Sequence, residues 1–157
     1  MSDSNRTQWP TEDVIGPFNG DNEYLSNFYE AEFEYNGTTF PTSEHAFQGM
    51  KAVDEEEIYD KIASASSPKK AKRYGKEPSL PEDWNERKKF VMLEVVTAKF
   101  AQNPEIREKL LSTDNEIIVE LNKWGDTYWG AKKGDGEGKN MLGRILMEVR
   151  SSFQSIQ

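Results

Sequence analysis

The spacing of apolar and polar positions along the chain predicts short strands in two places. Residues 33–40 (FEYNGTTF) alternate between apolar and polar positions on the way into Asn36-Gly37. This pair tolerates the positive φ angles of a type I′ turn, so the segment is predicted to form a β-hairpin. Residues 116–121 (EIIVEL) are short and β-branched, which predicts a further strand.

Helical spacing covers much of the rest of the chain. The longest predicted helix runs over about 82–101, and one stripe of it carries Trp84, Val91, Met92, Val95 and Lys99. The segment 66–75 has Ser67 as a cap, Pro68 at the first helical position and Gly75 as a stop, the usual asymmetry of helix ends. Further helices are expected after Pro41, over 54–63, from Asn103-Pro104 and over about 140–153.

These elements predict an α+β fold, compact and mostly helical, with a few short β-strands. The length of 157 residues fits a single domain. Residues 1–14 are polar and are expected to form a flexible N-terminal segment, which leaves 15–157 as the folded domain.

Composition excludes several kinds of chemistry. The chain has no cysteine and one histidine, so disulfides, thiolate zinc sites, cysteine nucleophiles and histidine metal clusters are ruled out. A Ser-His-Asp triad would have to use His45, and the chain contains no G-x-S-x-G motif. No apolar run approaches the roughly 18 residues of a membrane span, and the N-terminus lacks the basic and apolar blocks of a signal peptide. We therefore expect a cytoplasmic protein without membrane association.

The charge is negative overall but uneven. The net charge of −8 makes nonspecific binding to duplex DNA improbable, because such binding depends on a positive field. Basic residues nevertheless gather over 69–76 (KKAKRYGK). This run is either a solvated helix face or a surface that touches phosphates, and the spacing leaves both interpretations open.

The helix predicted after Pro41 (PTSEHAFQGMKA, 41–52) has an unusual polar stripe. Glu44, Phe47, Gln48 and Lys51 share one face at i, i+3, i+4 and i+7, and the opposite face holds Ala46, Gly49, Met50 and Val53. An aromatic ring among a carboxylate, an amide and an ammonium suits a pocket wall for a polar ring, with an anion at one end and a cation at the other. The alternative is an exposed helix that Glu44 helps to cap. The adjacent His45 points away from the stripe and is expected to pack or hydrogen bond.

The segment 124–140 (WGDTYWGAKKGDGEGKN) combines aromatic residues with glycines. Glycine allows a close approach of backbone to ligand, and the aromatic rings offer stacking faces. Asp126 is the carboxylate among the rings. The alternative is a tight structural loop whose rings fill the core. The segment does not match a phosphate-binding loop or a calcium loop, although Lys139-Asn140 could contact an anion at the start of the last helix.

Taken in order, short motifs along the chain resemble the NADAR superfamily. The resemblance covers about residues 21–151 and rests on LSNF (25–28), PTSEHAFQGMK (41–51), SSP (66–68), Trp84 with Lys88 and Met92, AKF (98–100), DTYWG (126–130), and GKNMLG and LMEVR within 138–150. It implies a compact, helix-rich α+β fold and an N-glycosidase activity. YbiA-type members resemble hydrolases of phosphorylated riboflavin-pathway intermediates, and other members remove ADP-ribose from guanine bases in nucleic acid.

The resemblance also implies roles for particular residues. Glu44 would be the catalytic carboxylate, and Asp126 is our candidate for a second catalytic role, the positioning of ribose hydroxyls or of the base. The expected substrate-binding residues are Asn27, Phe28, Phe47, Gln48, Lys51, Trp84, Lys88, Trp129, Gly130 and Asn140. The chemistry calls for no metal and no redox cofactor.

Two departures from the family pattern bear on the substrate. Ala46 stands where the motif often has tyrosine, and Lys132 and Lys133 add positive charge to the glycine-rich run. Both favour a larger substrate, ADP-ribosylated guanine in DNA or RNA. The alternatives are a small phosphoribosyl intermediate of riboflavin biosynthesis, a module that binds ADP-ribose or nucleotides without hydrolysis, and a structural interaction domain. No obligate protein partner is expected.

Overall fold

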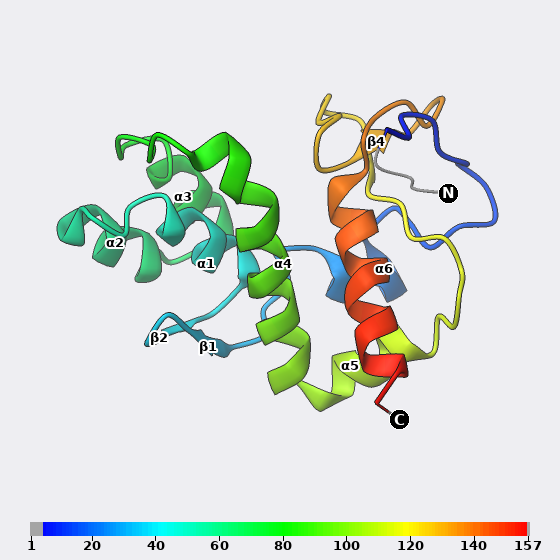
Figure 1. The fold of residues 1–157 in the computed structure, drawn as a ribbon, viewed down its shortest axis with the longest axis horizontal. Helices are drawn as coiled ribbons and strands as arrows, with labels where there is room; N and C mark the ends of the chain where they lie inside the picture. The colour runs from blue at the N-terminus through cyan, green and yellow to red at the C-terminus, as the bar shows by residue number, and fades with distance from the viewer. Residues whose placement is uncertain (1–4, 157) are drawn as a thin grey trace. The chain divides into compact units, whose positions relative to one another are not determined.

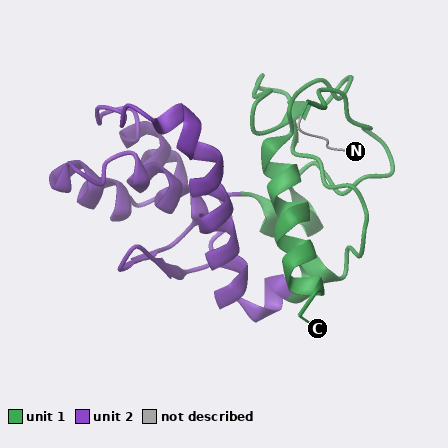
Figure 2. Cartoon of the chain, viewed as in Figure 1, with its two compact units in different colours: residues 1–26, 108–157 green, residues 27–107 purple. Residues whose placement is uncertain are grey.

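The computed structural model describes residues 5–156, and these form two compact units, one from residues up to 26 and from 108 onward, the other from 27–107 (Figure 2). Unit 2, residues 27–107, contains β1 (Phe33–Tyr35), β2 (Thr38–Phe40), α1 (Ser43–Met50), α2 (Glu56–Ala63), α3 (Pro68–Tyr74), α4 (Trp84–Gln102) and the first part of α5 (Pro104–Leu111). Unit 1 contains a 3-10 helix, η1 (Gly20–Leu25), the end of α5, β3 (Leu121–Asn122), β4 (Ala131–Lys132) and α6 (Met141–Gln154). The predicted helix-rich α+β class is confirmed.

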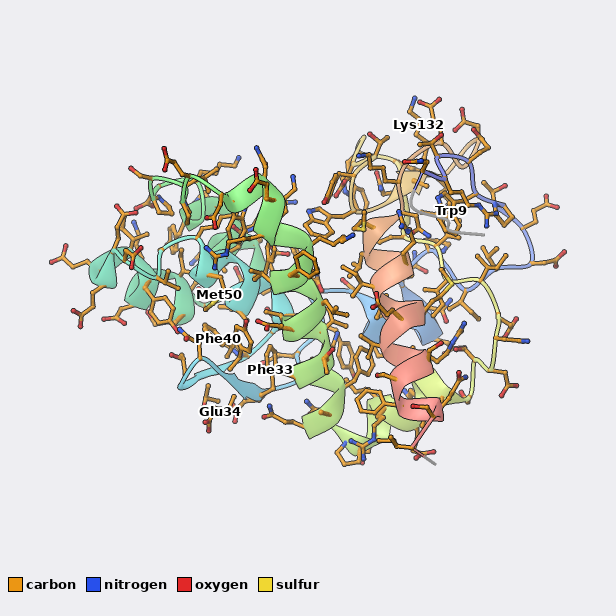
Figure 3. All side chains as sticks on the ribbon, viewed as in Figure 1. Trp9, Phe33, Glu34, Phe40, Met50 and Lys132 are labelled. Atoms are coloured by element: carbon orange, nitrogen blue, oxygen red, sulfur yellow. The ribbon has the colours of Figure 1, made fainter. Side chains whose placement is uncertain are left out.

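The hairpin of unit 2 forms as predicted. Strands β1 and β2 pair antiparallel with Phe33 opposite Phe40. Asn36 and Gly37 have φ angles of 55° and 74°, so both residues of the turn adopt positive φ. The rings of Phe33 and Phe40 lie 6.4 Å apart between centroids and belong to the core (Figure 3).

Helix α1 is enclosed by the rest of unit 2. It packs against α2, α3, α4 and β2 (Figure 1), and all eight of its residues are buried. The alternative of an exposed, self-capping helix is therefore wrong. The expected core residue Val53 lies beyond the end of α1 and is 42% exposed, because the helix ends at Met50.

Helices α3 and α4 follow the local signals of the sequence. Ser67 caps α3 by accepting a hydrogen bond from the Lys70 backbone N–H, and Pro68 is the first helical residue. In α4 the buried positions include the whole predicted stripe, Trp84, Val91, Met92, Val95 and Lys99. A 19-residue helix with one buried stripe is stabilised mainly by this packing.

The N-terminal segment of unit 1 differs from the prediction of a flexible residue 1–14 stretch. Trp9 is buried in a cluster with Val119, Leu121 and Ala131, and its indole N–H donates to the Gly138 carbonyl at 3.1 Å. The Trp9 backbone N–H also bonds to Gly136 at 2.9 Å. The tryptophan attaches the described part of this segment to unit 1, whereas residues 1–4 lie outside the described range.

The strand predicted over 116–121 is wrong in extent. β3 begins only at Leu121 and pairs parallel with β4, with Leu121 opposite Ala131. Before it, Ile118 forms an isolated bridge with Ile15, and the Ile118 carbonyl accepts from the Asn140 side chain. The backbone groups of 117–120 thus bond to a loop and to one side chain, so no longer strand forms.

None of the helices within residues 5–156 combines the length and the apolar character that crossing a bilayer requires.

Candidate active site

The start of α1 fixes the position of Glu44. Thr42 caps the helix by accepting a hydrogen bond from the His45 backbone N–H at 3.1 Å. The Glu44 N–H donates to the Asn27 carbonyl at 3.0 Å, which joins the helix to the segment before the hairpin. Glu44 lies in the first helical turn, where the helix dipole stabilises a negative charge, and its side chain is buried.

Gln48, one turn further along α1, holds the Glu44 carboxylate. Its side-chain N–H₂ donates to Glu44 Oε2 at 2.6 Å, inside the protein. The Gln48 carbonyl oxygen Oε1 is buried and has no hydrogen-bond partner among the described residues. An unsatisfied buried acceptor costs about 1–3 kcal/mol, and such groups concentrate at functional sites. The amide therefore has a position that stability alone does not favour.

Gly75 explains how the Gln48 amide fits. A Cβ atom placed on Gly75 would overlap Oε1 and Cδ of Gln48, so any larger residue would displace the amide. Gly75 is predicted as a helix stop, and it does follow the last residue of α3. Its φ of −63° is ordinary, so close contact rather than unusual backbone geometry requires glycine here.

The aromatic residues of the site pack on each other. The Phe47 and Trp84 ring centroids are 5.4 Å apart with the planes tilted by 51°. Both side chains are nearly fully buried, so they form a supporting wall. Phe47 is 5% exposed and Trp84 is 4% exposed, so neither ring has an open face in this structure. Lys51 Nζ lies 5.7 Å from the Phe47 ring centroid, which places an ammonium at the edge of this wall.

A group of lysines surrounds Lys51. Burial lowers the pKa of the Lys51 amine, the nearby Glu44 carboxylate raises it, and Lys88, Lys72 and Lys76 lower it further. Lys51 and Lys88 are predicted site residues, but Lys72 and Lys76 belong to the basic run whose role the sequence leaves open. Their spacing of four residues is the signal that could have identified them, because it places both on one side of α3 or just after it.

Asn27 and Phe28 precede the hairpin. The Asn27 side-chain oxygen accepts from Ser43 Oγ at 2.8 Å, and its amide lies 3.5 Å from Met92 Sδ. With the bond from Glu44 to its carbonyl, Asn27 acts on the position of α1. Phe28 is 42% exposed and belongs to the accessible part of unit 2.

His45 has a structural environment, as expected. Its Nε2 is 2.9 Å from the Ala65 carbonyl and its Nδ1 is 2.7 Å from Thr42 Oγ1. A carbonyl can only accept, so Nε2 carries the proton and Nδ1 accepts from threonine. Burial lowers the pKa of the imidazole. The ring is therefore neutral, and both of its nitrogens have hydrogen-bond partners within the fold.

The other predicted site residues belong to unit 1. Asp126 Oδ1 accepts hydrogen bonds from the backbone N–H groups of Tyr128 (3.1 Å) and Trp129 (2.9 Å), so this oxygen orders the turn. The backbone of Asp126 is held in turn by both side-chain atoms of Asn122. Trp129 is half-buried and packs edge-on against Tyr128.

Gly130 and Asn140 maintain the loop. A Cβ on Gly130 would overlap the Glu120 carbonyl and the Asn122 amide. Asn140 is fully buried, donates to the Ile118 carbonyl at 2.9 Å and accepts from the Glu120 N–H at 2.8 Å. Both polar atoms of its side chain bond to backbone groups, which gives Asn140 a structural role, and its contact with substrate stays a prediction.

The first N–H groups of α6 are also occupied. Those of Met141 and Leu142 donate to the carbonyls of Tyr128 and Trp129. The predicted anion contact at Lys139-Asn140 therefore lacks free helix N–H donors at these two positions. Within residues 5–156, no three His, Asp or Glu side chains gather in a way that could hold a metal ion.

Known proteins are similar to this chain over nearly its whole length. Residues 16–154 match the family model described as the NADAR domain. The N-glycosidase YbiA of Escherichia coli (strain K12) is 40% identical over 155 residues, which cover 98% of this chain and 91% of that protein. The NMR structure of the E. coli protein superposes with a TM-score of 0.80 at 37% identity, covering 98% of this chain and 92% of the other.

A second kind of relative is longer. A riboflavin biosynthesis protein of Vibrio vulnificus (strain YJ016) is 37% identical over 134 residues, which cover 83% of this chain but 35% of that protein. The same domain thus occurs in a larger protein whose name refers to riboflavin biosynthesis.

Proposed function

The chain belongs to the NADAR family and is an N-glycosidase, and from this premise we propose that it removes ADP-ribose from ADP-ribosylated guanine with Glu44 as the catalytic carboxylate. Guanine in DNA, in RNA or in a nucleoside presents the same scissile bond, between ribose C1′ and nitrogen. The observation that carries the proposal is the buried Glu44 carboxylate, which Gln48 holds at 2.6 Å in the first turn of α1.

This carboxylate suits the charge that develops during cleavage. Breaking a C1′–N bond gives the ribose oxocarbenium character, which a nearby carboxylate stabilises. The helix N-terminus and the Gln48 amide favour the ionised form of Glu44 and fix its orientation. Glu44 can also orient or deprotonate the attacking water. A buried carboxylate held by a hydrogen bond keeps its position without reorganising during the reaction.

The lysines near Lys51 support a substrate with two linked phosphates. Lys51, Lys72, Lys76 and Lys88 interact electrostatically in one region of unit 2. Each ammonium acts as a point charge toward phosphate. Four cations exceed what a single phosphate needs, whereas the diphosphate of ADP-ribose matches them better. Lys51 Nζ lies 5.7 Å from the Phe47 ring centroid, beside the Phe47–Trp84 wall, and would hold the phosphate nearer the ribose.

For Asp126 we propose a supporting role. Because Oδ1 holds the turn before Trp129, Asp126 orders the loop of unit 1 that also contains Trp129 and Gly130. Its removal should affect substrate binding and loop stability more than the chemical step. In unit 2, Asn27 and Phe28 would lie beside the substrate, with Asn27 positioning α1.

The second candidate is hydrolysis of a phosphorylated intermediate of riboflavin biosynthesis. The specific observation in its favour is the similarity to the V. vulnificus protein named for that pathway. Such a substrate has the same ribose–nitrogen bond and one phosphate, so it would use Glu44 in the same way. It would leave part of the lysine group without a phosphate partner.

A parallel substrate screen distinguishes these functions. The wild-type chain, Glu44→Gln and the control Glu57→Gln, an exposed carboxylate on α2, are incubated with ADP-ribosyl-guanosine, with ADP-ribosylated single-stranded DNA and with phosphorylated riboflavin intermediates. We expect release of ADP-ribose by wild type and by Glu57→Gln, and a loss of about 10²-fold or more with Glu44→Gln. Turnover of the riboflavin intermediates alone would support the second candidate. Tight binding of ADP-ribose without cleavage of any substrate would identify a binding module instead.

A further inference from the structure

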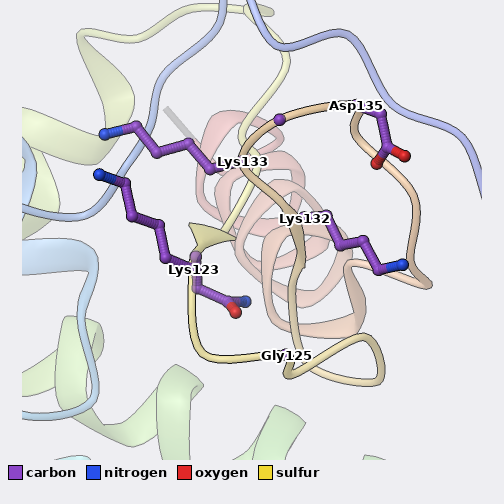
Figure 4. Close-up of a pocket in the computed structure, with 7 residues that line it drawn as sticks. Lys123, Gly125, Lys132, Lys133 and Asp135 are labelled. Carbon is purple, nitrogen blue, oxygen red and sulfur yellow. The ribbon is translucent and has the colours of Figure 1, made fainter.

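The parallel strand pair of unit 1 brings two lysines together. Asn122, the last residue of β3, lies opposite Lys132, the last residue of β4, so Lys123 and Lys133 leave neighbouring parallel strands at the same end. The Lys133 N–H donates to the Asn122 carbonyl at 2.9 Å, which fixes this adjacency. Figure 4 shows both side chains extending in one direction from the pocket that they line.

This pocket is basic. It has a volume of about 420 Å³ and is lined by three lysines and one aspartate, Asp135. Lys132 extends to the other side (Figure 4) and pairs with Glu137 at 3.5 Å, while one Asp135 oxygen accepts the Glu137 N–H. Within the described residues, Lys123 and Lys133 have no carboxylate partner of this kind. Two neighbouring ammonium groups repel each other unless an anion lies between them.

An exposed tryptophan follows the first lysine of this pair in the chain. Trp124 is 72% exposed, the largest exposure of any tryptophan among the described residues, and it follows Lys123 directly. An indole left in water offers both faces for stacking, and aromatic rings beside cations are the usual elements of a surface that binds single-stranded nucleic acid. The overall negative charge of the chain disfavours general attraction to duplex DNA. Binding of nucleic acid would therefore depend on a local contact of this kind.

From this arrangement we propose that Lys123, Lys133 and Trp124 form a binding surface for single-stranded nucleic acid. The two ammonium groups contact neighbouring phosphates, and the indole stacks on a base. The inference deepens the proposed function, on which it rests for its biological meaning, because it selects a modified strand over a free nucleoside as the natural substrate. It requires no cleavage, and unmodified strands bind by the same contacts.

The test measures binding of an unmodified, fluorescently labelled single-stranded DNA of about ten nucleotides by anisotropy over a range of salt concentrations. The proteins are the wild-type chain, Lys123→Ala/Lys133→Ala, Trp124→Ala and a charge-matched control, Lys89→Ala/Lys109→Ala, which removes two exposed lysines elsewhere. The lysine pair should weaken binding about 10-fold at low salt and reduce the salt slope by about 1.4, the value for two single-strand phosphate contacts. Trp124→Ala should weaken binding about 5-fold or more with the slope unchanged.

Three results would overturn the proposal. The first is equal affinity of Lys123→Ala/Lys133→Ala and the control. The second is equal binding of a duplex of the same length with no effect of Trp124→Ala, which would indicate general attraction to phosphate. The third is full competition by millimolar inorganic phosphate, which would indicate a small-anion site. Because the DNA is unmodified, these outcomes are independent of whether the chain cleaves ADP-ribosyl-guanine.

Discussion

Helix α1 in unit 2 and the glycine-rich loop 124–140 in unit 1 both carry polar side chains that the sequence predicts to be functional. The hydrogen-bond partners of these side chains differ between the two regions. In α1 the side chains of Glu44 and Gln48 bond to each other, and one amide oxygen has no hydrogen-bond partner among the described residues. In the loop, Asp126 and Asn140 bond to backbone groups. The first arrangement places reactive groups at a cost in stability, and the second stabilises a scaffold. Substitutions in α1 should therefore act on turnover, and those in the loop on folding.

The largest effect on stability is expected for Asn140→Ala. The substitution leaves the Ile118 carbonyl and the Glu120 N–H without their partner in a fully buried place. At about 1–3 kcal/mol for each of the two unsatisfied groups, the free energy of unfolding should fall by about 2–6 kcal/mol. Urea denaturation measures the change, and the exposed Asn85→Ala serves as the control. Similar stability of the two variants would contradict the scaffold role of Asn140.

A pH-dependent effect on the free energy of unfolding is expected for Lys99, a buried residue of α4 in unit 2. Burial lowers the pKa of its amine to about 7, whereas the unfolded chain has the ordinary value near 10.5. Between these values the unfolded state binds more protons than the folded state, so stability rises with pH. From pH 7 to pH 9 the gain attributable to Lys99 is about 2 kcal/mol.

Chemical denaturation at the two pH values measures this gain in wild type and in Lys99→Met. The variant lacks the titrating group, so its stability should depend less on pH. Parallel pH profiles for the two proteins would show that Lys99 keeps its proton in the folded state.

Gly75→Ala should disturb the Glu44–Gln48 pair from outside helix α1. The added Cβ meets the Gln48 amide and displaces its hydrogen bond to Glu44. We expect kcat to fall about 10-fold with a smaller change in KM, because the lost interaction orients the reacting carboxylate.

A double-mutant cycle with Gln48→Ala is the control for Gly75→Ala. Once the amide is absent, the added methyl group has room, so the double variant should be no less active than Gln48→Ala alone. Additive losses from the two substitutions would show that Gly75→Ala does not act through the Gln48 amide.

The smallest effect is expected for Lys72→Ala/Lys76→Ala. These exposed lysines act on the substrate diphosphate through charge, so KM for ADP-ribosyl-guanosine should rise several-fold, about 5–10-fold at low salt, with kcat nearly unchanged. The matched control is Lys69→Ala/Lys70→Ala, which removes two exposed charges from the same helix. Equal changes in KM for the two pairs would show that Lys72 and Lys76 contribute only through the net charge of the protein.

Local signals in the sequence were sufficient for several elements. Asn36-Gly37 specified the hairpin turn, Ser67-Pro68 specified the start of α3, and the stripe from Trp84 to Lys99 specified the buried side of α4. Each depends on residues within one or two turns of each other. The same holds for the pairing of Glu44 with Gln48, which follows from helical spacing.

Long-range contacts account for what the sequence did not reveal. The burial of every residue of α1 depends on packing by α2, α3 and α4, and the contact of Gly75 with Gln48 joins positions 27 residues apart. Trp9 lies in a polar segment, and only its contact with residues beyond 118 makes it part of a core. The strand expected at 116–121 is shorter because its backbone groups bond to Ile15 and to the side chain of Asn140.

The most direct test of the account compares single-turnover cleavage of ADP-ribosyl-guanosine by Glu44→Gln and Asp126→Asn, with thermal unfolding recorded for both proteins. We expect Glu44→Gln to keep wild-type stability and to lose about 10²-fold or more in the rate of ADP-ribose release. Asp126→Asn should lose stability and retain most of the chemical rate. A Glu44→Gln protein that releases ADP-ribose at the wild-type rate would contradict the catalytic role of Glu44.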